Sequence, residues 1–98
     1  MSSTKPYLDF ILEQLSDIPN LTYRPMMGEY LLYSNDILFG GVYDDRLLIK
    51  ITPGNDQLGL PEAIPYPGAK PMYLIEDVDD KESLAKIIKK TVSGLSTR

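Results

Sequence analysis

Few side chains in this chain could carry out chemistry, because its sequence contains no cysteine and no histidine. Without a thiol, a cysteine nucleophile, a disulfide and a thiolate zinc site are all excluded. Without imidazole, the commonest general base and transition-metal ligand is missing. Lys50 is the only candidate for a catalytic amine, and that role would need a pKa lowered by burial or by neighbouring charge. We therefore expect a protein that is not an enzyme, and we assign no catalytic, cofactor-binding or metal-binding residue.

Two short motifs could suggest a ligand, but packing explains both better. The neighbouring thioethers of Met26 and Met27 could bind Cu(I), yet no other soft ligand is present, so we expect them to pack in the core or at an interface. Gly40-Gly41 lies within an apolar run and lacks the Lys-Ser/Thr pair that follows a phosphate-binding loop. We expect a β-bulge there, or a close approach of the first helix to the sheet.

Charged residues cluster in three places, and none of the clusters has the pattern of a specific site. The acidic run near the start of the last predicted helix lacks the glycine and the distal glutamate of an EF-hand loop. The pair Asp44-Asp45 is typical of a turn. Three lysines fall on the solvent side of the last predicted helix, where they favour its dipole. The acidic run comprises Glu76, Asp77, Asp79 and Asp80, and the lysines are Lys86, Lys89 and Lys90.

The length and the charge limit the class of protein. The chain has 98 residues, which is the size of one domain, and we expect a single domain over residues 1–98. Its net charge of −4 and pI of about 4.6 disfavour direct nucleic-acid binding, which needs a basic face. No apolar run approaches the roughly 18 residues of a membrane span. The first residues also lack a secretory signal, so we expect a cytoplasmic protein.

The apolar pattern predicts an α+β domain of two layers. A helix from about Lys5 to Asp17 is expected, with Ser3 or Thr4 as its cap, because apolar residues recur at helical spacing. Leu21 to Arg24 can form an extended piece. Short polar turns then separate apolar runs, which predicts an antiparallel three-stranded meander. Its strands are Gly28 to Tyr33, Ile37 to Tyr43 and Arg46 to Ile51, joined by turns at Ser34-Asn35-Asp36 and Asp44-Asp45.

The second half of the chain predicts a long Pro/Gly loop, a fourth strand and a C-terminal helix. The loop runs from Pro53 to Lys70, and Asn55 to Leu60 could form one helical turn within it. We interpret it as a crossover to a distant position in the sheet, with a functional role as the alternative. Apolar residues that could fix it in place are Leu58, Leu60, Ile64 and Tyr66.

The fourth strand is expected from Pro71 to Glu76. The last helix should begin at Asp79 and Asp80, with Asp79 and Glu82 as a capping pair, and should stop at Gly94.

Seven tyrosines offer the clearest functional signal in the composition. Four of them fall in or beside predicted strands, and tyrosine is enriched at protein interfaces. If two helices cover one face of the sheet, the other face exposes apolar side chains that a partner or a second copy could cover. The residues that we expect on this interaction surface are Tyr30, Leu32, Leu38, Leu48, Lys50 and Tyr73.

The stretch Arg24-Pro25-Met26-Met27-Gly28-Glu29-Tyr30, the segment Arg46 to Lys50 and the strand Lys70-Pro71-Met72-Tyr73 resemble the N-terminal domain of the TfoX/Sxy family. These are bacterial proteins linked to competence regulation. The resemblance covers about residues 5–95, and Met27 replaces an aromatic residue of the family pattern. It implies an α+β fold similar to secretion-chaperone-like domains and no known catalytic residues. It also implies a stand-alone domain, because no sequence for the family's C-terminal domain follows the last helix.

Three functions remain open at this stage. The leading hypothesis is a regulatory module that acts through contact with a partner protein or with itself, as a homodimer. The second is a transcriptional accessory that contacts DNA or a DNA-bound regulator, for which the three helix lysines, Arg24 and Lys50 would have to converge. The third is a small-ligand binder that uses a pocket between the long loop and the sheet, with Tyr66, Tyr73, Lys50 and Arg24 as its polar groups.

Overall fold

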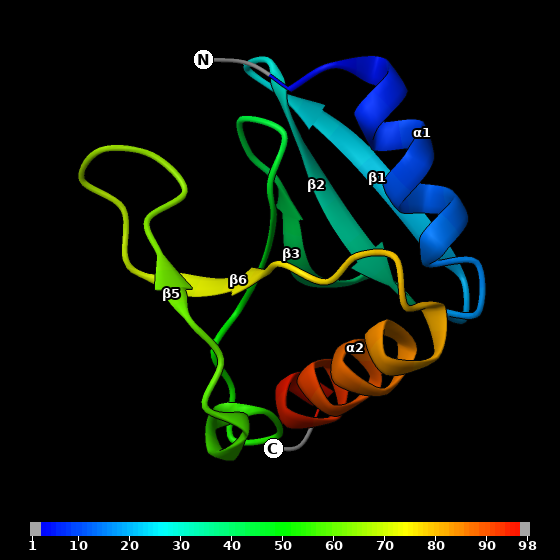
Figure 1. Ribbon diagram of the computed structural model, residues 1–98, viewed down its shortest axis with the longest axis vertical. Helices are drawn as coiled ribbons and strands as arrows, with labels where there is room; N and C mark the ends of the chain where they lie inside the picture. Colours follow the sequence, from blue (N-terminus) through cyan, green and yellow to red (C-terminus); the bar gives the residue numbers. More distant parts are fainter. Residues whose placement is uncertain (1–2, 97–98) are drawn as a thin grey trace.

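The computed structural model describes residues 3–96 and places six strands in one sheet, with two α-helices packed on it (Figure 1). This arrangement confirms the predicted α+β class. In chain order the elements are α1 (Lys5–Gln14), β1 (Leu21–Met26), β2 (Glu29–Ser34), β3 (Ile37–Val42), β4 (Leu47–Ile49), the 3₁₀ turn η1 (Asp56–Leu58), β5 (Glu62–Ala63), β6 (Met72–Ile75) and α2 (Lys81–Ser96). None of the helices in residues 3–96 is long and apolar enough to cross a membrane.

Both helices begin at a side-chain cap. Thr4 caps α1, and its Oγ1 accepts a hydrogen bond from the Tyr7 N–H at 3.3 Å. The helix ends at Gln14, earlier than the predicted Asp17. Asp80 caps α2 by accepting from the Ser83 N–H at 3.1 Å, so the predicted Asp79–Glu82 capping pair is wrong by one position.

Three tight turns connect the first four strands. Each has two central residues with positive φ, which is the geometry of a type I′ hairpin and matches the twist of the sheet. The turns at Asn35-Asp36 (φ 51° and 65°) and Asp44-Asp45 (54° and 54°) were predicted. The third lies at Met27-Gly28 (50° and 87°) and pairs β1 with β2 along its full length. The meander therefore has four strands, because the extended piece at Leu21 is a complete strand.

The strand order is β1-β2-β3-β4-β6-β5, so β1 and β5 are the two edges. The chain passes from β4 to the far edge and then returns, which inserts β6 between β4 and β5. This confirms the interpretation of the long loop as a crossover. On the other edge, Pro25 lies opposite Tyr30, next to the pair that closes the hairpin. Alternate pairs exchange hydrogen bonds, so the nitrogen of Pro25 faces away from β2, where a missing N–H costs the sheet nothing.

The two central glycines of β3 are required by close packing. The register between β2 and β3 shifts at Leu32/Tyr33, so a bulge is present but falls on Phe39, next to the predicted Gly40-Gly41. A Cβ at Gly40 would lie 2.3 Å from the carbonyl oxygen of Leu48. The close approach therefore comes from the neighbouring strand, not from the first helix.

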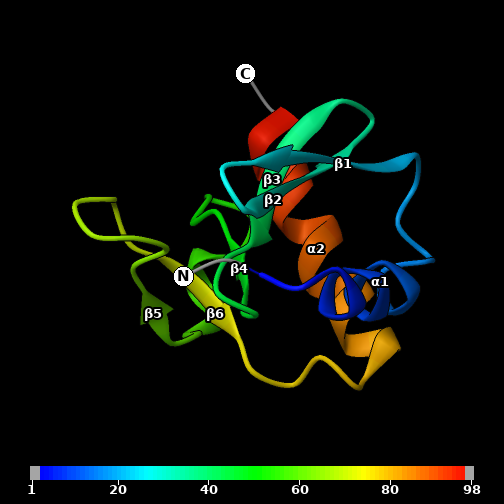
Figure 2. The same ribbon diagram turned by 90° about the horizontal axis from the view of Figure 1, so that it is seen from above.

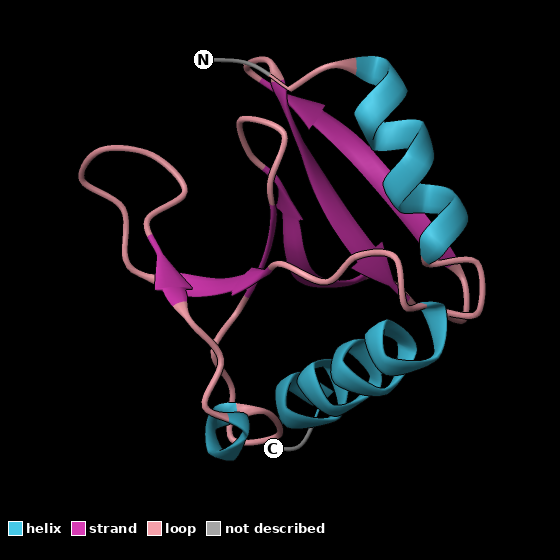
Figure 3. Cartoon of the chain, in the orientation of Figure 1, coloured by secondary structure: helices cyan, strands magenta, loops and turns pink. Residues whose placement is uncertain are grey.

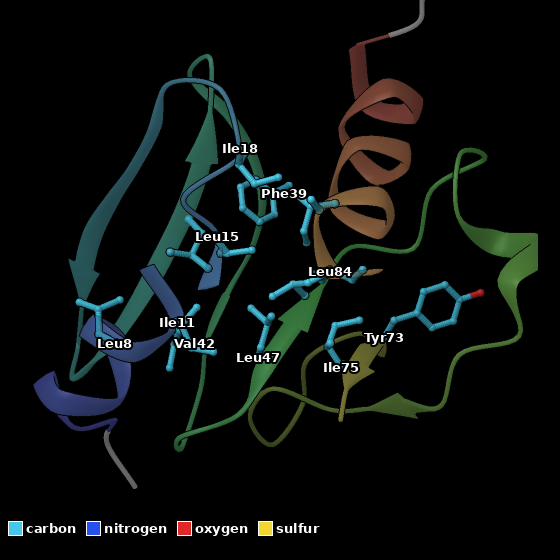
Figure 4. Close-up of a cluster of buried hydrophobic side chains, with 14 residues drawn as sticks. Leu8, Ile11, Leu15, Ile18, Phe39, Val42, Leu47, Tyr73, Ile75 and Leu84 are labelled. Carbon is cyan, nitrogen blue, oxygen red and sulfur yellow. The ribbon is translucent and has the colours of Figure 1, made fainter. Parts of the chain in front are cut away.

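One face of the sheet carries the core, and both helices cover it. Figure 2 shows α1 and α2 on the same side of the curved sheet. Apolar side chains from the two helices meet those of the strands, as Figure 4 shows for ten labelled residues. The fully buried members from the helices and the C-cap of α1 are Leu8, Ile11, Leu15, Leu84 and Ile88, and those from the sheet are Leu32, Phe39, Val42, Leu47 and Ile49.

Buried polar groups, rather than apolar ones, attach the start of the long loop to α2. The amide of Asn55 is fully buried. Its Oδ1 accepts from the Thr52 N–H at 2.8 Å, and its Nδ2 donates to the Lys50 carbonyl at 2.9 Å and to Thr91 Oγ1 at 2.7 Å. Of the four apolar residues predicted to hold the loop, Leu60 packs against the core, whereas Leu58, Ile64 and Tyr66 are exposed.

Two glycines allow this contact between the loop and the helix, which Figure 1 shows near the C-terminal end of α2. A Cβ at Gly54 would lie 1.9 Å from the Lys90 carbonyl oxygen, and one at Gly94 would lie 2.5 Å from Thr52 Oγ1. Gly94 is therefore not the helix stop that we predicted. It lies inside α2, which runs on to Ser96, because only a residue without a side chain lets the loop approach.

Candidate functional site

The sheet face opposite the helices, here called the open face, carries half of the predicted interaction surface. Leu38, Leu48 and Lys50 lie on it, since Leu38 pairs with Tyr33 and Leu48 with Gly41. The other three predicted residues lie on the face that the helices cover. Leu32 is fully buried there, Tyr73 is 5% exposed and Tyr30 packs against the core. The prediction that these three residues lie on the uncovered face is therefore wrong, because strand pairing places Leu32, Ile49 and Tyr73 in one row under the helices.

The open face is not bare, because a tyrosine and a loop cover its centre. Leu48 is fully buried although neither helix lies on its side. The ring of Tyr43 lies against Gly41, where a Cβ would come within 2.8 Å of it, and Gly41 is the pairing partner of Leu48. The Tyr66 ring, in the loop between β5 and β6, lies 6.2 Å from the Tyr43 ring. The Tyr43 ring therefore lies next to the position of Leu48 on this face, and Tyr66 lies beside Tyr43.

The loop of residues 64–71, here called the β5–β6 loop, extends away from α1 (Figure 3). Arg46 fixes its first residues: its Nη2 donates to the carbonyls of Ile64 and Pro65 at 3.4 and 3.5 Å, while its Nε donates to the Tyr43 carbonyl at 3.2 Å. Pro65 is buried. A planar, always charged guanidinium suits three carbonyl acceptors, so the start of this loop has a defined position on the open face.

Between the β5–β6 loop and the sheet lies a hollow of about 660 Å³, here called the groove. This volume falls within the range of ligand-binding pockets, roughly 300–1,000 Å³. Its floor comes from β3 and the two residues after β4, and its wall comes from β5, the β5–β6 loop and the start of β6. The lining residues that matter below are Leu38, Lys50, Ile51, Tyr66, Lys70 and Met72.

The groove combines apolar surface with positive charge. Ile51 and Tyr66 are 40% and 52% exposed, which is high for large apolar side chains. Lys50 and Lys70 supply two ammonium groups, against the single carboxylate of Glu62. The surroundings are therefore suited to an anion attached to an apolar group. Burial raises the pKa of the Tyr43 hydroxyl, and Tyr66 and Glu29 add to this, so Tyr43 stays a neutral donor at physiological pH.

The third hypothesis placed a pocket between the long loop and the sheet, and a hollow is present there. Lys50 and Tyr66 line it as expected. Tyr73 does not, because it faces the helices, and its hydroxyl donates to the Asp56 carbonyl at 3.4 Å. Arg24 stacks over the ring of Tyr33, 5.8 Å from its centroid, outside the groove. Sequence reasoning missed Lys70 and Ile51, since only the crossover brings β6 and its flanking loop alongside β4.

The remaining sequence candidates do not converge on a site. Met27 is 98% exposed at a hairpin tip, so core packing is the wrong interpretation for it. Within residues 3–96, no group of three or more acidic side chains could hold a metal ion. The lysines of the DNA hypothesis are split, because Lys50 and Arg24 belong to the open face and the helix lysines are exposed on α2, beyond the other face; these are Lys86, Lys89 and Lys90.

This geometry defines an α+β domain that has helices on one sheet face and a groove with charged and apolar residues on the other. The family described as the TfoX N-terminal domain matches residues 13–95 of the chain, so the protein belongs to that family. It is also similar to an uncharacterized 12.7 kDa protein in the trpE 5' region of Spirochaeta aurantia. The two chains are 34% identical over 80 residues, which cover 80% of this chain and 70% of that protein.

Proposed function

We propose that this protein is a non-enzymatic cytoplasmic module that regulates competence-related processes by binding another protein at the groove. Membership of the TfoX N-terminal domain family supports the regulatory role. The observation that carries the proposal is the groove itself, which exposes large apolar side chains beside unshielded positive charge on the only sheet face that no helix covers within residues 3–96. Exposed apolar surface of this kind marks a place of contact with a partner.

Direct contact with DNA has less support. Phosphate binding needs several cations on one surface, whereas Lys50 and Arg24 are separated from the α2 lysines by the thickness of the domain. The net charge of −4 also repels a polyanion over longer distances. Regulation through a protein contact needs no such basic surface.

A genetic complementation experiment tests the proposal. The gene is deleted in the native host, and transcripts of the DNA-uptake genes are measured after complementation with wild type or with either of two double variants. Lys50→Glu with Lys70→Glu reverses the charge of the groove. Lys86→Glu with Lys90→Glu makes the same change of charge on the exposed surface of α2 and is the matched control.

We expect wild type and the α2 variant to restore the transcripts and the groove variant to fail, with all three proteins at equal abundance. Full restoration by the groove variant, or no change in transcripts on deletion, would contradict the proposal. If the α2 variant alone fails, the contact surface lies on the helices instead.

A further inference from the structure

We infer that the groove binds an extended acidic segment of the partner, one that places a carboxylate at Lys50 and Lys70 and an apolar side chain against Tyr66. The inference rests on the proposed protein contact and adds the chemistry of what is recognised. Its grounds are the unpaired charge of the groove, the exposure of its apolar lining and its open shape.

Neither of the two groove lysines has a carboxylate partner among residues 3–96. Within residues 3–96, the ion pairs are Lys5–Asp9 at 2.8 Å and Lys81–Glu13 at 3.5 Å. Lys50 and Lys70 thus form no ion pair within the described part of the chain, although acidic residues outnumber basic ones by 14 to 10 in the sequence. Lys50 is half-buried in the groove lining. Its charge is therefore less screened than that of a fully exposed lysine, and a carboxylate brought close to it is attracted more strongly.

The apolar part of the groove matches a side chain of leucine or phenylalanine size. Leu38, Ile51 and Met72 form the apolar surface, and Met adapts its shape to different partners. Tyr66 stands at its side with half of its surface exposed. Covering these residues removes apolar surface from water at the same step at which the carboxylate meets the lysines.

The shape of the groove favours a peptide segment over a small metabolite. It is a hollow open to solvent, not an enclosed cavity. Sites for small molecules bury most of the ligand and present precisely placed polar groups. In residues 3–96, every buried side-chain polar atom has a hydrogen-bond partner, so none of them is available to bind such a ligand. A chain that crosses an open groove can instead continue over the neighbouring surface.

Titration of the ¹⁵N-labelled protein followed by NMR tests this inference. The probe is a blocked hexapeptide in which aspartate alternates with leucine and phenylalanine, and the comparison peptide has asparagine in place of each aspartate. We expect the acidic peptide to shift the amide signals of Leu38, Ile51 and Tyr66 and to bind about tenfold more tightly than the neutral one. The Lys50→Glu, Lys70→Glu variant should lose this preference, while Lys86→Glu, Lys90→Glu keeps it.

Each other outcome overturns the inference. Equal binding of the two peptides removes the acidic requirement, and shifts outside the groove place the contact elsewhere. Tighter binding of benzoate than of the peptide would identify a site for a small organic acid, and concentration-dependent shifts without any peptide would identify a second copy of the chain as the occupant. If the peptides fail while the groove variant still loses function in the host, the protein contact stands and only its acidic chemistry is wrong.

Discussion

Replacing Asn55 with alanine should lower the free energy of unfolding by about 3 kcal/mol. The amide makes three hydrogen bonds, and its loss leaves the Thr52 N–H and the Lys50 carbonyl without their partners. Thr91 is less affected, because its hydroxyl still donates to the Ile87 carbonyl at 2.9 Å. Each orphaned buried group costs about 1–3 kcal/mol. About 1.5 kcal/mol for each of the two groups, in the lower half of that range, gives about 3 kcal/mol.

Urea unfolding monitored by circular dichroism measures this loss. With an m value of about 1–3 kcal/mol per molar urea, the midpoint should fall by about 1–3 M. Gln57→Ala is the control, because Gln57 is exposed in the same segment and makes one side-chain bond of 3.3 Å to the Gly54 carbonyl. Its effect should stay within about 0.5 kcal/mol. A loss of under about 0.5 kcal/mol for Asn55→Ala would refute the claim that this amide fixes the loop on α2.

Asn55→Asp tests the direction of the hydrogen bonds. It keeps an acceptor for the Thr52 N–H but turns a carboxylate oxygen toward the Lys50 carbonyl. Burial and this carbonyl should raise the pKa of the new carboxyl above its usual value of about 3.9. The folded variant then keeps a proton that the unfolded chain loses, so its stability should fall as the pH rises past about 4. A variant as stable as wild type at pH 7 would show that donation from the Asn55 amide to the Lys50 carbonyl contributes nothing to stability.

Three further outcomes are expected. Gly94→Ala should cost about 2 kcal/mol or more in thermal unfolding, because its Cβ would lie 2.5 Å from Thr52 Oγ1, and an unchanged melting temperature would contradict this contact. Met27→Asn should add about 0.5 kcal/mol of stability in urea, since asparagine tolerates a φ of 50° better; a loss would show that Met27 makes stabilising contacts. Burial raises the pKa of Tyr43 above 10.0, so the folded state holds its proton longer and stability should fall as the pH rises above 10.0; Tyr43→Phe should flatten that fall in alkaline unfolding curves.

Local patterns predicted most of the elements of this fold. The spacing of Leu8, Ile11 and Leu15 predicted a helix with one apolar face, and all three are fully buried. Asn35-Asp36 and Asp44-Asp45 marked hairpin turns because asparagine and aspartate tolerate positive φ. These signals depend on a few neighbouring residues, so a single sequence contains them.

The face that each strand presents could not be predicted in the same way. Leu32 and Leu38 both belong to apolar runs, but the bulge in β3 decides which of them meets the helices. Gly94 had the signature of a helix end, and only the approach of Gly54 from 40 residues earlier explains its place within α2. The groove depends on the same crossover, because Lys50 and Lys70 become neighbours through sheet order and not through sequence.

Pro25 makes the β1 edge of the sheet less able to pair with a strand of another molecule. A strand at the margin of a sheet normally offers its free N–H groups as a template on which another molecule can build, and repeated addition of this kind leads to fibrils. At β1 the proline, the fifth of six residues, withholds one of these donors, and β5, at the opposite margin, has only two residues. Pairing of one copy's sheet with that of the next is thereby discouraged at both edges, so we expect the protein to resist strand-by-strand association.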